Sequence, residues 1–142
     1  MNVADSRLDP RIEAIASHIG RRLADAAVED MRARYDFGRV LHTLRNRGRG
    51  VEGAGALRVL AGRLAVDPSA LRRFAQVSDV IPAGEFQWMM RLRSPRGAPL
   101  TWSHVELLAR LRSAEQRRAL ATAAVEEELS VRALFQRLRG HR

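Results

Sequence analysis

Two adjacent arginines and a glutamine one helical turn later are the side chains of this sequence best suited to recognise a ligand. Arg72 and Arg73 can each donate two parallel hydrogen bonds to a guanine edge or to a phosphate, and Gln76 can pair in this way with an adenine edge. Ser69, near the start of the same predicted helix, can bind a phosphate. These residues together predict contact with the major groove of double-stranded DNA.

The residues around this cluster predict two short helices joined by a tight turn. Ala61 is a small residue where the two helices would cross, and Ala65 opens the turn at a position where glycine is commoner. Asp67 is expected to cap the second helix, with Pro68 at its first position. The shared core is expected to hold Leu60, Leu64, Val66, Leu71 and Phe74. This spacing is typical of a helix-turn-helix, whose second helix enters the major groove.

The rest of the chain also predicts helices, and no stretch shows the alternation of a strand. We therefore expect an all-α protein: an N-terminal long helix or helical hairpin, followed by a multi-helix helix-turn-helix domain. Capping boxes are expected to begin at Ser103, with Glu106 as its partner, and at Ser113, and Ser130 can cap the last helix. After the N-terminal segment we expect helices at residues 56–65, 69–80, 84–93, 103–111, 114–128 and 131–139.

The N-terminal segment, residues 9–47, carries apolar residues at helical spacing after a cap at Asp9 and Pro10. It is expected to be one long helix, or two helices that break between residues 25 and 36, and Gly38 weakens its second half. So long a stripe needs a partner surface, either the C-terminal part of the same chain or a second copy. The stripe comprises Ile12, Ile15, Ile19, Leu23, Ala26, Ala27, Met31, Phe37, Leu41 and Leu44.

A glycine-rich stretch at residues 48–55 predicts a linker. The chain is therefore divided into an N-terminal helical segment (1–47) with a possible role in dimerisation, this linker, and a DNA-binding domain (56–142). Arg47 and Arg49, at the linker, can lie along a phosphate backbone, although a solvated linker is the alternative. Arg58, Arg63 and Arg96 are the other candidate phosphate contacts.

The overall charge supports a polyanionic partner. All 25 basic residues are arginine, and the formal net charge is +9. The absence of cysteine excludes disulfides and thiolate metal sites, and no apolar run is long enough for a membrane span. The first ten residues lack the apolar core of a signal peptide. We therefore expect a cytoplasmic, nucleoid-associated protein that does not act on membranes.

No set of side chains predicts catalysis, so we expect no enzymatic activity and no cofactor or metal. The four histidines are scattered, and none pairs with another at metal-ligand spacing. Glu126, Glu127 and Glu128 point in different directions on a helix and cannot converge on one ion. Trp88 and Trp102 can stack on bases, but a place in the core is the simpler interpretation.

The C-terminal half resembles the central DNA-binding domain of ParB-type partition proteins. The resemblance lies in Leu100-Thr101-Trp102-Ser103-His104 and Leu129-Ser130-Val131-Arg132, and it covers roughly residues 56–140. It implies a helix-turn-helix, with Thr101, Ser103 and His104 as further DNA contacts. Nothing matches the Gly-Glu-Arg-Arg motif of that family, so CTP binding is not implied. Glu106 replaces an arginine of the family pattern.

The sequence also resembles the helical domain that precedes PD-(D/E)XK nuclease domains, which shares the Trp-Ser-His step and an aromatic-x-x-Gly pattern similar to Tyr35-Asp36-Phe37-Gly38. Both resemblances imply DNA binding. Because one short helix reads few base pairs, we expect a homodimer on a palindromic site, joined through the N-terminal stripe. The alternative is a non-catalytic adaptor that docks a protein partner through its N-terminal helix.

Overall fold

The computed structural model describes residues 9–47 and 51–140, except the side chains of residues 44–47, 51–54 and 56. Within these residues it contains seven α-helices and no strand, which confirms the predicted all-α class. No helix in this part of the chain combines the length with the apolar composition that a bilayer span requires. The helices are α1 (Pro10–Arg47), α2 (Val51–Leu64), α3 (Pro68–Val80), α4 (Ala83–Arg91), α5 (Trp102–Leu108), α6 (Ala114–Glu126) and α7 (Val131–Gly140).

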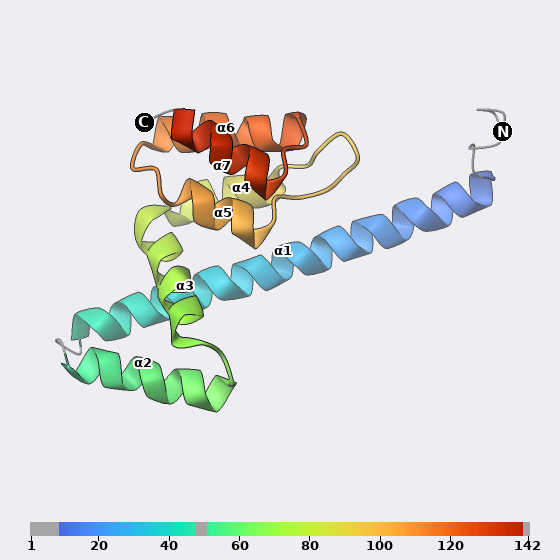
Figure 1. Ribbon diagram of the computed structural model, residues 1–142. Coiled ribbons are helices and arrows are strands. Elements are labelled where there is room, and N and C mark those ends of the chain that lie inside the picture. The colour runs from blue at the N-terminus through green and yellow to red at the C-terminus, as the bar shows by residue number, and fades with distance from the viewer. Residues whose placement is uncertain (1–8, 48–50, 141–142) are drawn as a thin grey trace.

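The helices are arranged around the C-terminal half of α1 (Figure 1). Helix α3 crosses α1 and packs against it, α2 lies beside the end of α1, and α4 to α7 gather on the other side of the crossing. The N-terminal half of α1 projects away from the other helices. The loop at residues 95–99 approaches that half, where the two line a shallow groove, and the end of α4 approaches it near Asp25.

Helix α1 is a single helix, which decides between the two alternatives that the sequence left open. The Asp9 carboxylate accepts a hydrogen bond from the Arg11 backbone N–H at 2.8 Å, as expected of a cap. Gly38 does not break the helix. Its position faces the backbone of α3 so closely that a Cβ atom would overlap the carbonyl oxygen of Phe74. The glycine therefore permits the crossing of α1 and α3.

A tyrosine one turn before Gly38 joins the same crossing to the end of α3. The Tyr35 hydroxyl donates a hydrogen bond to the backbone oxygen of Ile81 at 2.6 Å, and its ring stacks on Phe86 with centroids 4.1 Å apart. In return, the Ser78 hydroxyl donates to the Tyr35 backbone oxygen at 2.7 Å. The aromatic-x-x-Gly pattern thus has a structural explanation: Tyr35 holds the end of α3 and Gly38 lets its backbone approach.

Two apolar clusters form the core. The larger joins the middle of α1 and the end of α3 to α4 through α7, and Phe86, Met89, Val105 and Leu108 have no exposed surface within it. The smaller joins the C-terminal part of α1 to α2 and the first half of α3. It consists of Leu41, Leu57, Ala61, Leu71 and Ala75, with Phe37, Leu60, Val66 and Phe74 packed around them. The helix-turn-helix pair is therefore attached to the long helix by a core of its own.

Two predictions about the region before α3 differ from the structure. Helix α2 begins at Val51, within the stretch expected to be a linker, so residues 51–55 are helical despite Gly53 and Gly55. Residues 48–50 of that stretch lie outside the described residues. Leu64 was expected in the shared core but is 49% exposed, because the turn begins immediately after it and directs it to solvent.

The start of α5 also differs from the prediction. Thr101, not Ser103, is its N-cap, and it forms a capping box with His104. Both Thr101 and Ser103 carry a hydroxyl that can cap a helix. In the structure the helix starts at Trp102, whose side chain is buried, so Thr101 is the cap. Glu106 is therefore not a capping residue. The caps expected at Ser113 and Ser130 are present, with hydrogen bonds from the Gln116 and Ala133 backbone N–H groups.

A buried ion pair fixes the C-terminal helices to one another. Arg117 of α6 donates two hydrogen bonds to the Glu85 carboxylate of α4, at 2.7 and 3.1 Å, and a third to the backbone oxygen of Leu111. Both side chains are almost fully buried. Because both charges are satisfied by several hydrogen bonds, the pair orients α4 against α6, and loss of either partner would leave a buried charge.

Candidate nucleic-acid interface

The turn between α2 and α3 has the geometry that the sequence predicted. Ala65 adopts a positive φ of 53°, the left-handed conformation that favours glycine. The Val66 backbone N–H donates to the Ala61 oxygen at 3.0 Å, which closes the C-terminal turn of α2. Val66 packs against the smaller core cluster. The next helix starts at once, because Asp67 accepts from the Ser69 backbone N–H at 2.8 Å and Pro68 follows.

Helix α3 has one buried and one exposed face. Leu71, Ala75 and Val77 are buried, and they attach the helix to α1, α2 and the larger core. Arg72, Arg73 and Gln76 are all exposed, and the start of the helix contributes the half-buried Ser69. The structure thus brings together on one helix face the four residues that the sequence singled out.

Arg73 is held in place on this face by two neighbours, Glu106 and Ser69. Its guanidinium lies 3.0 Å from the Glu106 carboxylate of α5 and donates to the Ser69 hydroxyl at 3.4 Å. The Ser69 hydroxyl in turn donates to Asp67 at 2.8 Å. Hydrogen bonds from the Ser69 backbone and hydroxyl, then the charges of Arg73 and Arg72, hold the pKa of Asp67 below its ordinary value of 3.8. The Arg73 side chain is therefore ordered by contacts within the chain, whereas the Arg72 side chain faces solvent.

A third arginine, which the sequence analysis did not single out, supports α3 from behind. The Arg34 guanidinium of α1 lies 5.9 Å from the ring centroids of both Phe74 and Trp102, which meet edge to face. It also pairs with Asp30 at 3.1 Å. Trp102 is buried, as the core interpretation expected, and Trp88 is half-buried beneath Arg118. Neither indole is displayed on the face of α3 for stacking on bases.

The remaining predicted contacts lie on other elements than α3. Arg58 and Arg63 are exposed on α2, the helix before the turn. Arg96 belongs to the loop before α5, is 87% exposed in its side chain, and lies 3.6 Å from Glu128. Thr101 and Ser103 are exposed at the start of α5. The last two candidates, Arg49 and the side chain of Arg47, lie outside the described residues.

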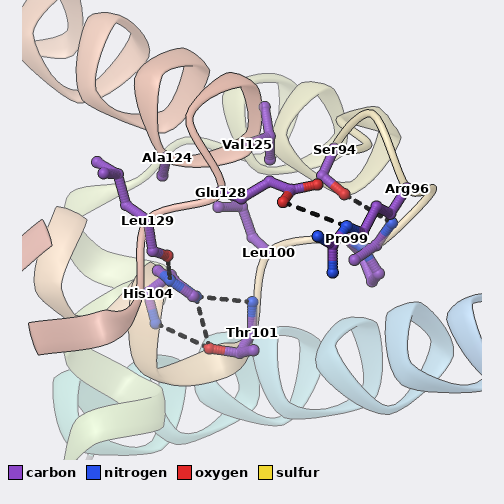
Figure 2. Close-up of a pocket in the computed structure, with 11 residues that line it drawn as sticks. Ser94, Arg96, Pro99, Leu100, Thr101, His104, Ala124, Val125, Glu128 and Leu129 are labelled. Atoms are coloured by element: carbon purple, nitrogen blue, oxygen red, sulfur yellow. Dashed lines mark hydrogen bonds and ion pairs between the residues drawn. The ribbon is translucent and has the colours of Figure 1, made fainter. Parts of the chain in front are cut away.

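His104 is buried and its ring bonds within the chain (Figure 2). One ring nitrogen, Nε2, lies 2.8 Å from the Leu129 backbone oxygen, and Nδ1 lies 3.1 Å from the Thr101 backbone nitrogen. Because a carbonyl only accepts, Nε2 carries the hydrogen and Nδ1 accepts the Thr101 N–H. Both nitrogens are occupied in this way, so His104 joins α5 to the α6–α7 turn and we exclude it from the proposed DNA contacts.

The pocket in which His104 lies offers little chemistry for a ligand. It has a volume of about 310 Å³ and lies between the loop before α5 and the end of α6. Its polar side chains are bonded to the protein itself: Thr101 to His104, Ser94 to the Ala98 backbone, and Arg96 to Glu128 (Figure 2). Among the described residues, no group of three histidines or carboxylates is arranged to hold a metal ion.

In comparisons with known proteins, no family model, no curated protein and no solved structure matches this chain. The assignment of a function therefore depends on the site itself.

Proposed function

We propose that this protein binds double-stranded DNA by placing α3 in the major groove. The observation that carries the proposal is the exposed cationic face of α3. Arg72, Arg73 and Gln76 lie on this face, and α3 follows a tight turn from α2. The buried face of the same helix is fixed to three other helices, so the exposed face can be presented to a groove as a rigid unit. The excess of arginine over acidic residues favours a polyanion.

The residues of this face are suited to different contacts. Arg72 and Gln76 are one helical turn apart and are the candidates for base edges, guanine and adenine respectively. Arg73 is already oriented by Glu106, so it can meet either a guanine or a phosphate with little loss of side-chain entropy. Ser69 adds a hydroxyl at the N-terminus of the helix, and Arg58 and Arg63 of α2 are candidates for phosphates.

A regulatory, partition-like or nucleoid-associated role in the cytoplasm fits these properties, with two copies of the protein on a palindromic site. Phosphate contacts release counterions, so affinity is expected to fall with salt with a slope of roughly −0.9 per phosphate contact. The same slope distinguishes the two roles of Arg73. A phosphate contact contributes to the slope, whereas a guanine contact contributes mainly to base preference.

The test is the double variant Arg72→Ala with Arg73→Ala, measured as retention of DNA fragments at moderate salt. We expect retention to be lost while the melting temperature is unchanged, because both side chains are exposed. A matched control is Arg132→Ala with Arg139→Ala, which removes the same charge from exposed positions of α7. Equal retention by both double variants and the unaltered protein would overturn the proposal.

A single variant of α5 sharpens this test. Glu106→Gln keeps the size of the side chain but removes the negative charge beside Arg73. If Arg73 binds a phosphate, the variant is expected to bind DNA more tightly, because a competing carboxylate is gone. If Arg73 reads a guanine, the variant is expected to lose preference at one base pair, because the arginine is no longer oriented.

The adaptor remains the second candidate, favoured by the exposed apolar stripe on the N-terminal half of α1. Ile12, Ile15, Ile19 and Leu23 are each at least half exposed. A patch of this kind indicates a protein contact. If the protein is an adaptor, changes at the stripe are expected to abolish capture of its partner, and changes at Arg72 and Arg73 are expected to have no effect.

A further inference from the structure

The apolar stripe of α1 lies on a different face from the one that packs against the protein's own core. Ile12, Ile15, Ile19 and Leu23 are exposed, at spacings of three and four residues. The buried residues follow the same spacing in a different phase: Ala24, Val28, Met31 and Tyr35. At about 100° per residue, the two sets occupy separate sides of the helix. The exposed stripe therefore remains uncovered when the fold is complete.

Charged residues accompany the stripe in a regular arrangement. Arg11, His18 and Asp25 are seven residues apart. Arg11 and His18 directly precede Ile12 and Ile19 of the stripe, and Asp25 precedes the exposed Ala26. These three residues form one flank of the apolar face, with Arg11 at its beginning and Asp25 at its end. The exposed Arg22, one turn before Asp25, lies between this flank and the stripe. Within the described residues neither the Arg11 nor the Asp25 side chain takes part in an ion pair, and both are exposed.

We propose that residues 10–27 of α1 pair antiparallel with the same residues of a second copy. In the register of an antiparallel coiled coil, Ile15 packs beside the partner's Ile19, and Ile12 beside the partner's Leu23. Arg11 then faces the partner's Asp25, and the two-fold axis repeats this ion pair at the other end. The paired segment is about 27 Å long, from the rise of 1.5 Å per residue.

The occupant is a second copy because the segment is complementary to itself only in this direction. A two-fold axis perpendicular to the helix brings the positive end of the flank against the negative end of its copy. A parallel pair would place this flank against the opposite flank of the partner, at Ala16 and Gly20, where it meets no charge. On the other flank, Ala16 and Gly20 are small, and no atom lies within 4 Å of where a Gly20 Cβ would be. A partner helix can therefore approach closely.

This pairing deepens the dimer of the proposed function, but its test uses no DNA. Sedimentation of the full chain over a wide range of concentration is expected to show a monomer–dimer equilibrium. Arg11→Glu alone, or Asp25→Arg alone, should weaken the dimer about tenfold, because two ion pairs become two repulsions. The double variant Arg11→Glu with Asp25→Arg should restore the dimer, since the charges are exchanged. Arg132→Glu in α7 is the control for a changed net charge.

Cysteine cross-linking tests the direction of pairing, because the natural sequence contains no cysteine. An equal mixture of Arg11→Cys and Asp25→Cys proteins should cross-link to each other under mild oxidation, whereas each alone should not. In the antiparallel register the two copies of residue 11 lie about 21 Å apart along the helix axis. Cross-linking of each variant to itself would overturn the antiparallel register.

Two other outcomes would contradict the pairing. A full chain that remains monomeric at every concentration would overturn it, and so would a dimer that survives Ile19→Asp unchanged. The second experiment also separates the two proposals. Ile19→Asp lies far along α1 from the face of α3, so lost dimerisation with retained weak DNA binding supports both. Loss of DNA binding by Arg72→Ala with Arg73→Ala, with the dimer intact, leaves the pairing unaffected.

Discussion

The two halves of α1 have similar apolar periodicity and opposite surroundings. In the second half, Met31, Tyr35, Gly38 and Leu41 are buried beneath α2, α3 and the C-terminal helices. In the first half, the equally regular Ile12, Ile15, Ile19 and Leu23 face solvent. The pattern therefore indicates that a helix face needs a partner, but it does not identify the partner. Where the partner is another helix of the same chain, as in the second half, the structure shows close contacts such as that of Gly38 with the Phe74 backbone.

The largest expected difference between the halves comes from the same substitution at two leucines. Leu41→Ala removes a side chain that is 1% exposed in the smaller core cluster, and should cost about 2–5 kcal/mol of unfolding free energy. Leu23→Ala removes one that is 66% exposed, and should change it by about 0.5 kcal/mol or less. Urea unfolding at low protein concentration measures both. Equal losses would mean that the first half of α1 is buried within the monomer.

The helix crossing gives the next largest effect. Gly38→Ala places a methyl group against the Phe74 carbonyl oxygen and the Ser78 hydroxyl, so α1 and α3 must separate. The better helix propensity of alanine offsets part of the strain, and we expect a net loss of about 2 kcal/mol. Thermal unfolding followed by circular dichroism measures it. A variant as stable as the unaltered protein would show that the crossing is looser than the structure has it.

Tyr35 tests the same half of the helix through its hydroxyl. Tyr35→Phe leaves the Ile81 backbone oxygen without its donor and should cost about 1–2 kcal/mol. Burial, with smaller effects of Asp36 and Glu85, raises the pKa of Tyr35 above its ordinary 10.0, and Arg39 opposes this. The folded state therefore favours the protonated phenol. This contribution is complete below pH 10 and is lost as the pH rises through the pKa of the folded state.

The dependence of the unfolding free energy on pH, measured above pH 10, tests the direction of this pKa shift. Unfolding free energy should fall above pH 10 in the natural protein and fall less steeply in Tyr35→Phe. A steeper fall in the variant would contradict the direction of the shift in the pKa of Tyr35.

Much of the fold follows from local signals that the sequence displays. Asp67 and Pro68 place the start of α3, and Ser113 and Ser130 place the starts of α6 and α7, because caps act within a few residues. The conformation of Ala65 follows from the turn that surrounds it. The exposed set on α3 follows equally from helical spacing. At the start of α5 both Thr101 and Ser103 carry a hydroxyl, and only the packing of the helix decides which of them is the N-cap.

What the sequence did not predict depends on residues that are distant along the chain. Glu106 lies 33 residues after Arg73, and no periodicity connects them. The buried pair of Arg117 and Glu85 was missed for the same reason, since charged residues are expected at the surface. Helix propensity predicts a weak point of α1 at Gly38, whereas in the structure α3 crosses α1 at this residue. The DNA-binding role of α3 stays a prediction until retention is measured.

The smallest effect concerns the other glycine of α1 and tests the exposed half directly. Gly20 lies within the projecting segment, and nothing would meet a Cβ atom there. Gly20→Ala should therefore stabilise this half of the helix by roughly 0.5–1 kcal/mol, because alanine loses less backbone entropy. Since the projecting half has few tertiary contacts, amide hydrogen exchange of residues 12–24 should slow, while global unfolding changes little. The measurement is made at a protein concentration at which the chain is monomeric. Destabilisation by Gly20→Ala there, opposite in sign to this expectation, would show that another part of the same chain already occupies this position.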